Sequence, residues 1–225
     1  MFERFKHRSY ELERLDTGDY TEAEYRRWHQ EMRFIHRAFG EIRALRNTLF
    51  RDVGTGTERV AILDVGAGSG ELLRELKKWF GRRASLTGVE VNEMAAKAFK
   101  SSDVAAVIAD GLRLPFETDS FDTAFCSLTL HHLSDDDAPQ LLAEMARVSR
   151  GRIYSIDLNR DPLAYYFYKT VGSLFLQRLT LDDGSLSILR SFTAEELRGV
   201  ADEAGLRNVK VEHSRVNRLV LSGTK

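Results

Sequence analysis

A glycine-rich segment that contains one carboxylate is the part of this 225-residue chain whose chemistry is easiest to interpret. The segment reads Leu63-Asp-Val-Gly-Ala-Gly-Ser-Gly70 and continues a short apolar run. Glycines let the backbone approach a ligand closely, and a helix that follows them presents its free amides. The spacing is neither the dinucleotide pattern G-x-G-x-x-G nor a P-loop, and Asp64 would repel a pyrophosphate. The pattern favours a cationic ligand; the alternative is a strand-to-helix turn that binds nothing.

Two further carboxylates stand at the ends of the next two apolar runs. Glu90 is placed where an acid accepts hydrogen bonds from ribose hydroxyls. Asp110 is placed to accept a hydrogen bond from the exocyclic amine of adenine, with Val91 and Leu112 on either side of the base. Glu90 alone could equally be a solvated charge at a strand end. Together with the glycine-rich segment, they indicate a ligand that contains a nucleoside and carries positive charge.

Two adjacent histidines, His131 and His132, follow a fourth apolar run. A histidine with a pKa near neutral could take a proton from a hydroxyl or a phenol. The alternative is that one or both histidines hydrogen-bond within the loop and have a structural role. Cys126 lies inside the apolar run, and we expect it to be a small buried hydrophobic residue.

Strand and helix patterns alternate at short intervals beyond residue 57, which predicts an α/β fold with helices on both faces of a sheet. The last two apolar runs are separated by a few residues, and such a short connection permits only an antiparallel pair. The expected strands span residues 60–65, 85–91, 104–109, 123–130, 152–158, 209–213 and 216–222. The expected helices span residues 71–80, 93–100, 134–149 and 193–205.

A helical pattern also occupies much of the region before the first strand. Thr21-x-x-Glu24 forms a capping box, and apolar residues then recur with spacings of three and four as far as Leu49. The pattern predicts one long helix, or two if Gly40 interrupts it. We therefore expect an N-terminal helical extension or lid over residues 1–57, which packs on the sheet or lines a pocket, and a ligand-binding domain over residues 58–225.

Composition and charge argue against several classes of protein. Lys and Arg total 33 and Asp and Glu total 34, and a net charge of −1 gives no electrostatic reason to expect nucleic acid as a partner. A single cysteine excludes an intrachain disulfide and a cysteine-based zinc cluster, and we expect no metal. Neither a signal peptide nor an apolar run of about 18 residues is visible, so we expect no transmembrane segment and a cytoplasmic location.

Taken in order, these motifs resemble those of the class I S-adenosylmethionine-dependent methyltransferases. The resemblance covers roughly residues 58–225 and rests on the glycine-rich segment and four later motifs: Val89-Glu-Val91, Ala109-Asp-Gly-Leu-Arg-Leu-Pro-Phe116, Ser120-Phe-Asp122 and Leu130-His-His-Leu133. The run from Asp110 to Asp122 is similar to the subgroup of ubiquinone/menaquinone biosynthesis methyltransferases. The resemblance implies a Rossmann-like fold whose seven-stranded mixed sheet has an antiparallel last strand. It also implies S-adenosylmethionine as cofactor and S-adenosylhomocysteine as product.

The resemblance assigns roles to individual residues. The residues expected to hold the cofactor are Asp64, Gly66, Ala67, Gly68, Gly70, Glu90, Val91, Asp110, Gly111, Leu112, Ser127 and Leu128. His131 and His132 are the candidates for a base or for positioning the acceptor. Acceptor specificity in this fold comes from additions to the sheet. Here the additions are the N-terminal extension, in which Arg33 or Arg37 could hold the cofactor carboxylate, and an insert over residues 160–190 that would cap the acceptor side. The aromatic residues expected to wall the acceptor pocket are Tyr165, Tyr166, Tyr168 and Phe175.

The sequence thus predicts in-line transfer of a methyl group to oxygen or carbon of a small aromatic or lipid-like acceptor. Such a reaction requires the two reactants to be aligned and desolvated more than it requires covalent help. Two alternatives stay open at this point. The acceptor is a protein or an RNA, or the chain is a non-catalytic partner subunit that keeps the fold and the cofactor site.

Overall fold

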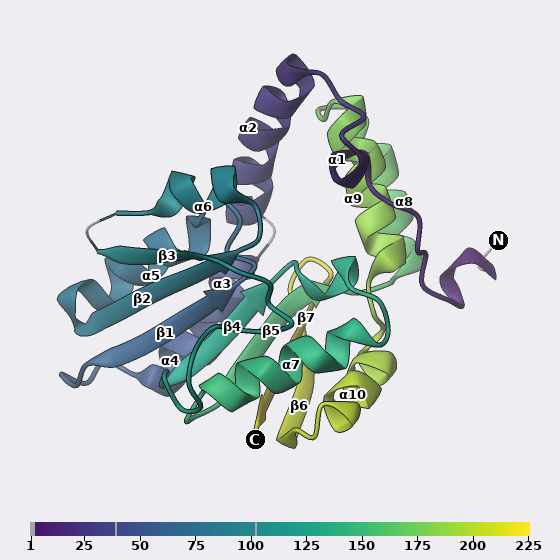
Figure 1. Ribbon diagram of the computed structural model, residues 1–225. Helices are drawn as coiled ribbons and strands as arrows, with labels where there is room; N and C mark the ends of the chain where they lie inside the picture. The colour runs from purple at the N-terminus through teal and green to yellow at the C-terminus, as the bar shows by residue number, and fades with distance from the viewer. Residues whose placement is uncertain (1–2, 39, 102) are drawn as a thin grey trace.

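A seven-stranded mixed sheet lies at the centre of the computed structural model, which describes residues 3–38, 40–101 and 103–225 (Figure 1). The strands are β1 (Val60–Val65), β2 (Ala84–Glu90), β3 (Val104–Ile108), β4 (Thr123–Ser127), β5 (Ile153–Leu158), β6 (Arg207–Ser214) and β7 (Arg218–Thr224). Their order across the sheet is β3-β2-β1-β4-β5-β7-β6. Strand β7 runs antiparallel to both of its neighbours, and the other pairs are parallel. The predicted fold class is confirmed.

Helices cover both faces of the sheet, and each face has its own apolar core (Figure 1). The α-helices are α1 (Arg14–Thr17), α2 (Glu22–Ala38), α3 (Glu41–Leu45), α4 (Arg51–Val53), α5 (Glu71–Phe80), α6 (Glu93–Phe99), α7 (Asp137–Val148), α8 (Pro162–Gly172), α9 (Arg178–Arg190) and α10 (Ala194–Glu203). Short 3-10 or π-helical turns are η1 (Glu3–Phe5), η2 (Arg46–Phe50), η3 (Gly81–Arg83) and η4 (Leu130–His132). Helices α3, α5 and α6 pack on one face with Ile62, and α7 and α10 pack on the other with Leu63.

The fourth strand is shorter than the sequence pattern predicted. It ends at Ser127, whereas the apolar run suggested residues 123–130. Leu128 has a positive φ of 54°, a conformation that a strand cannot contain. The chain therefore leaves the sheet there and enters the η4 turn, which holds both histidines.

The N-terminal helical pattern is interrupted at Gly40, which has a φ of 105°. Helix α2 begins at the predicted capping box, in which the Glu24 amide donates to Thr21 Oγ1 and the Thr21 amide donates to Glu24 Oε2. Phe39, which belonged to the predicted apolar stripe, lies outside the described residues. Helix α2 rises away from the sheet, whereas α3 lies against it (Figure 1).

The insert between β5 and α10 forms a pair of helices, α8 and α9, beside the carboxyl end of β5 (Figure 1). The Tyr168 hydroxyl on α8 donates to the Thr180 carbonyl on α9 at 2.8 Å. The segment before α2 runs along α9, where the Ser9 amide donates to the Leu189 carbonyl at 3.0 Å. None of the helices among the described residues has the length and apolar character needed to cross a membrane.

Candidate functional site

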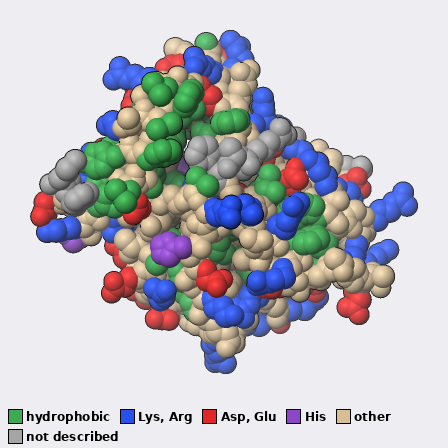
Figure 2. Space-filling view, turned by 180° about the vertical axis from the view of Figure 1, so that it is seen from behind, with side chains coloured by type: hydrophobic (Ala, Val, Ile, Leu, Met, Phe, Trp, Pro, Cys, Tyr) green, Lys and Arg blue, Asp and Glu red, His purple; other side chains and the backbone are tan. Residues whose placement is uncertain are grey.

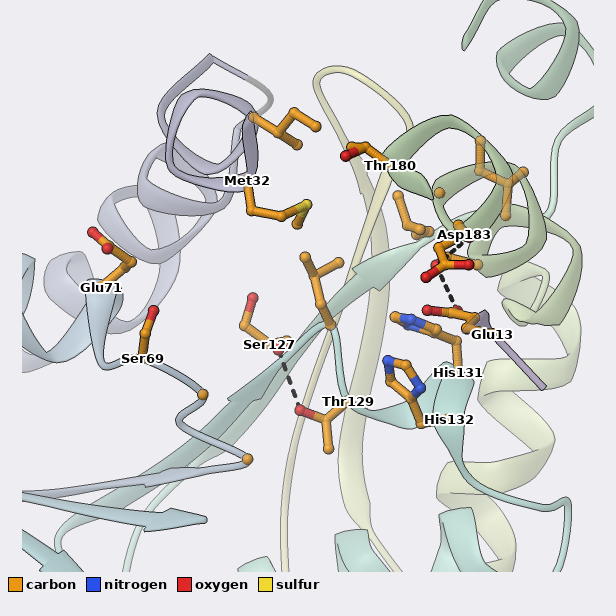
Figure 3. Close-up of a pocket in the computed structure, with 18 of the residues that line it drawn as sticks. Glu13, Met32, Ser69, Glu71, Ser127, Thr129, His131, His132, Thr180 and Asp183 are labelled. Atoms are coloured by element: carbon orange, nitrogen blue, oxygen red, sulfur yellow. Dashed lines mark hydrogen bonds between the residues drawn. The ribbon is translucent and has the colours of Figure 1, made fainter. Parts of the chain in front are cut away.

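One large cavity, with a volume of about 1630 Å³, lies at the carboxyl ends of the parallel strands. Its floor is the glycine-rich loop after β1 and the ends of β2 and β4, and its walls are α2, α8 and α9. In Figure 3, Ser69 and Glu71 lie on one side of the cavity and His131, His132 and Glu13 on the other. The carboxyl edge of a parallel sheet is where α/β proteins bind ligands. The cavity therefore brings the predicted cofactor and acceptor regions into one space.

The glycine-rich loop has a conformation that requires glycine at its first position. Gly66 has a φ of 75°, and a Cβ atom there would lie 2.6 Å from Thr129 Oγ1. The amides of Gly66 and Ala67 both donate to the Val89 carbonyl, which joins the loop to the end of β2. Gly68 also has a positive φ, and its Cβ position faces open space. The loop is thus fixed by its backbone and leaves room for a ligand against it.

Two carboxylates flank this loop. Glu90 accepts hydrogen bonds from the Gly68 amide at 2.8 Å and from the Asn92 amide at 3.0 Å. Asp64 is buried at the end of β1. Burial, and then the charge of Glu90, raise the pKa of Asp64 well above its ordinary value. A positively charged ligand would stabilise the ionised form of these two carboxylates. Among the described residues that line the cavity, Arg218 is the one arginine, so little positive charge from the protein opposes such a ligand. These charges fit a sulfonium.

The remaining residues of the predicted cofactor set also line the cavity, except Gly70. Asp110 Oδ1 accepts a hydrogen bond from the Leu112 amide at 2.9 Å, and the side chain of Val91 is exposed. The Ser127 hydroxyl is buried and has no hydrogen-bond partner among the described residues. The next residue, Leu128, holds the strained positive φ. An unpaired hydroxyl and local backbone strain are features of a site that a ligand completes.

His131 is held by a carboxylate that the sequence motifs did not reveal. Its side chain is buried, its Nδ1 lies 2.6 Å from Asp157 Oδ1, and its amide donates to Asp157 Oδ2 at 3.2 Å. Desolvation alone would lower the pKa of His131, but the charge and hydrogen bond of Asp157 outweigh it and raise that pKa above its ordinary value. Because Asp157 occupies Nδ1, the other ring nitrogen, Nε2, is the one left for a substrate.

The N-terminal segment adds a second carboxylate, Glu13, to this end of the cavity (Figure 3). Glu13 is 4% exposed, and its Oε1 accepts a hydrogen bond from the Ser187 hydroxyl at 2.7 Å. Burial raises the pKa of Glu13, although nearby His131 and Ser187 oppose the effect. His132 is more open, with 38% of its side chain exposed, but desolvation and the adjacent His131 still lower its pKa.

Glu13 reaches the cavity because α9 holds the preceding segment in place. Asp183 on α9 accepts hydrogen bonds from the amides of Arg14 and Leu15 at 2.9 and 3.1 Å. These bonds fix the start of α1, and Glu13 is the residue immediately before it. No motif near Glu13 in the sequence indicates this role, since its partners lie more than 100 positions away.

The possible ligand atoms of Glu13, His131 and His132 lie within 4.8 Å of one another. Among the described residues, these three form a group whose spacing could hold a metal ion. The guanidinium of Arg190 lies beside the same group and donates to the carbonyls of His131 and His132 at 3.2 and 3.1 Å. A buried, permanently charged cation at this distance opposes the binding of a divalent ion. This charge disfavours a metal ion at the group, and the expectation that the site contains no metal stays a prediction.

The predicted acceptor residues do not all face the cavity. Tyr168 and Phe175 line it, whereas Tyr165 and Tyr166 do not. Tyr165 is buried against Phe5, with ring centroids 5.4 Å apart, and Tyr166 contacts the same ring at 6.1 Å. Consecutive residues of a helix point about 100° apart, so a run of aromatic residues cannot all face one side.

Other apolar residues complete this wall of the cavity. They are Trp28, Met32, Phe34, Ile35, Leu163, Phe167, Val171 and Leu176. Arg33 does not line the cavity, and the side chain of Arg37 lies outside the described residues. Cys126 is buried inside β4, and burial raises the pKa of its thiol to about 12, so it is a packing residue as predicted.

Comparison with known proteins agrees with this geometry. Residues 62–151 match a family model described as a methyltransferase domain. Demethylmenaquinone methyltransferase from Staphylococcus aureus is 26% identical over 192 residues, which cover 77% of this chain and 78% of that protein.

Two solved structures illustrate the similarity in fold. One is a methyltransferase from Thermotoga maritima, described as a possible histamine N-methyltransferase, with a TM-score of 0.64 and 21% identity over 90% of this chain and 95% of that one. The other is human N-acetylserotonin methyltransferase in complex with S-adenosylmethionine, with a TM-score of 0.60 and 17% identity over 97% of this chain and 63% of that one. At these identities the similarity shows the fold alone.

Proposed function

We propose that this chain, a class I S-adenosylmethionine-dependent methyltransferase, transfers the methyl group to a small molecule with an aromatic ring and an apolar, lipid-like part. The observation that carries the proposal is the cavity of about 1630 Å³, whose acceptor side is walled by apolar residues of α2 and α8. Pockets for one small ligand usually measure about 300–1,000 Å³. The larger volume supports two ligands side by side, a cofactor and an acceptor with a chain.

S-adenosylmethionine supplies a methyl group on a positively charged sulfur, which an acceptor atom takes by in-line displacement. In our proposal Glu90 holds the ribose hydroxyls and Asp110 holds the adenine amine, between Val91 and Leu112. Asp64 and the loop that contains Gly66 and Gly68 hold the methionine part. The fit is supported by the buried Asp64 carboxylate beside that loop and by the Ser127 hydroxyl, which has no partner among the described residues.

His131 is the residue that we propose as the base toward an acceptor hydroxyl. Asp157 fixes the ring through Nδ1, so that Nε2 is free to accept the hydroxyl proton. The imidazolium that forms is stabilised by the negative charges of Asp157 and Glu13. The apolar walls exclude water from the acceptor, which favours reaction of its oxygen, or of a ring carbon activated by that oxygen.

The relative from Staphylococcus aureus is named for demethylmenaquinone. Under our proposal this chain methylates an acceptor of related character, a hydroquinone or phenol that bears an apolar chain. Residues 1–57 and 160–190 would select the acceptor, because they supply α2, Glu13, α8 and α9.

A test compares pairs of acceptors that share a ring and differ in the chain. Labelled S-adenosylmethionine would be incubated with the protein and naphthohydroquinone, with or without a geranyl group, and with a phenol and its alkylated counterpart. We expect the chain to raise kcat/KM by roughly tenfold or more, since each buried methylene contributes about 0.8 kcal/mol. Equal rates with and without the chain, or label transferred only to protein or RNA added to the assay, would refute the proposal.

A further inference from the structure

A second, smaller cavity of about 560 Å³ lies next to the site, and its lining is rich in arginine. The arginines are Arg43 on α3, Arg46 in the following η2 turn, and Arg215 in the turn between β6 and β7. Asn47 and Val216 complete much of the wall. The face drawn in Figure 2 shows Lys and Arg side chains near the middle of the view, beside hydrophobic side chains that gather over α8 and α9.

These three arginines are not neutralised by the protein. Within the described residues, no ion pair joins any of them to a carboxylate. Arg218, three positions after Arg215, is by contrast bound to Glu41 through Nε and Nη2 at 3.0 and 2.6 Å. Like charges that converge on one depression repel one another, and an anion placed between them removes that repulsion. Guanidinium groups match phosphate oxygens in geometry as well as in charge.

The surrounding structure fixes the elements that bring the arginines together. The bond between Arg218 and Glu41 ties α3 to the start of β7. On the other side, Asn217 Nδ2 donates to the Asn159 carbonyl at 2.8 Å, and the Asn159 amide donates to the Asn217 carbonyl at 3.1 Å. The arginines therefore project from a fixed platform, although their side chains are exposed.

The turn between β6 and β7 is strained at the residue that separates the two cavities. Val216 has a φ of 56°, which is unfavourable for a β-branched residue, and it is 47% exposed. Val216 lines both the arginine-rich cavity and the large cavity. Backbone strain of this kind is characteristic of functional positions. A ligand seated on the arginines would thus have an apolar surface and the entrance to the large cavity beside it.

We propose that Arg43, Arg46 and Arg215 form a binding site for the phosphate group of an amphiphilic ligand, whose apolar part lies toward Val216 and the large cavity. Two kinds of ligand carry such a phosphate group: an anionic phospholipid at a membrane surface and a free phosphorylated compound. Nucleic acid fits less well, because the chain has a net charge of −1 and the described residues that line this cavity include no aromatic ring to stack on a base. The site is separate from the methyl-transfer chemistry, and its test does not depend on the acceptor.

The first test measures binding of inorganic pyrophosphate to the full chain by calorimetry. We expect binding to weaken by roughly tenfold or more when Arg43, Arg46 and Arg215 are all replaced by Gln, because hydrogen bonds to charged groups are lost. A matched control replaces Arg59, Arg82 and Arg207 by Gln, three exposed arginines outside both cavities that remove the same charge. The control should bind pyrophosphate as the unmodified chain does, and both variants should keep their affinity for S-adenosylmethionine, which also reports that they are folded.

The second test distinguishes a membrane phospholipid from a free phosphorylated compound. Vesicles of phosphatidylcholine alone and vesicles that also contain phosphatidylglycerol would be sedimented with the protein. Retention on the phosphatidylglycerol vesicles that is lost in the Arg43/Arg46/Arg215 variant assigns the site to a membrane lipid. Binding of pyrophosphate without retention on vesicles assigns it to a free phosphorylated compound. The proposal is overturned if the unmodified chain binds neither probe, if the control variant loses binding equally, or if single-stranded RNA displaces both probes at far lower concentration.

Discussion

The large cavity is formed differently at its two ends. At the glycine-rich loop the site is formed mainly by the backbone, whereas at the histidines it is formed by side chains from segments that are far apart in the sequence. The glycine-rich loop and Glu90 are joined by hydrogen bonds between residues only 22 positions apart. The acceptor end joins Glu13 to Ser187, 174 positions away, and Arg14 to Asp183, 169 positions away. A site made by the backbone constrains its residue types tightly. A site made by side chains can change its specificity while the fold stays the same.

The largest effect is expected at the acceptor end, from replacing His131 by Asn. Loss of a general base typically costs about 10²–10⁴-fold in rate, so kcat should fall by that range. Affinity for S-adenosylmethionine should stay unchanged, because no predicted cofactor contact involves the His131 ring. Steady-state kinetics and calorimetry on the same sample separate the two quantities.

A matched control for this variant is His213→Asn, since His213 is exposed on β6 and outside the cavity. If His131→Asn lowers the affinity for cofactor as much as it lowers kcat, the two ends of the cavity are not independent. If kcat is retained, His131 is a structural residue and Asp157 serves only to hold the loop.

At the cofactor end, the corresponding change is Glu90→Ala. It removes the acceptor for the Gly68 amide as well as the proposed ribose contact. Hydrogen bonds to a charged group contribute about 1.5–3 kcal/mol, so the affinity for S-adenosylmethionine should fall by roughly tenfold to a hundredfold. The control is Glu93→Ala, whose carboxylate is exposed and pairs with Lys97. Cofactor binding that is equal in the two variants would rule out the proposed role of Glu90.

The same contrast explains which features were predictable from the sequence. The strands, the glycine-rich loop and the antiparallel pair follow from local patterns, and the structure brings Asp64, Glu90 and Asp110 to one cavity because parallel strands end at one edge. Local sequence patterns do not show which residues contact His131. Asp157 becomes its neighbour only when β5 pairs with β4, and Glu13 only when the N-terminal segment docks on α9.

The pH dependence offers a finer test of how the acceptor end is assembled. The groups that face His131 are Asp157 on β5, Glu13 before α1, Arg190 on α9 and the adjacent His132. Asp157 and Glu13 raise the pKa of His131, so its neutral, basic form is populated only above a pH higher than the ordinary value of 6.5. On the acid side of the pH profile, the acid limb, kcat/KM should therefore fall with a midpoint above pH 6.5.

Replacing Glu13 by Gln removes one of the charges that stabilise the imidazolium, so the acid limb should move to lower pH while the plateau at high pH changes little. The charge of Glu13 raises the pKa of His131, and Gln removes that charge, so the pKa of His131 falls. The exposed Glu11→Gln is the control. A limb that stays in place, or moves to higher pH, would show that Glu13 does not act on the base.

The smallest effect is expected at the outer wall of the cavity, from Phe175→Ala. Phe175 lines the cavity but is 66% exposed, so a bound chain would cover only part of it and contribute about 1 kcal/mol. The KM for an acceptor with an apolar chain should rise by roughly fivefold, and the KM for the same ring without the chain should not change. Leu174→Ala is the control, because Leu174 is also largely exposed and does not line the cavity. A rise in KM for both acceptors would place Phe175 against the ring, and the region that binds the ring would then extend from the histidines to the connection between α8 and α9.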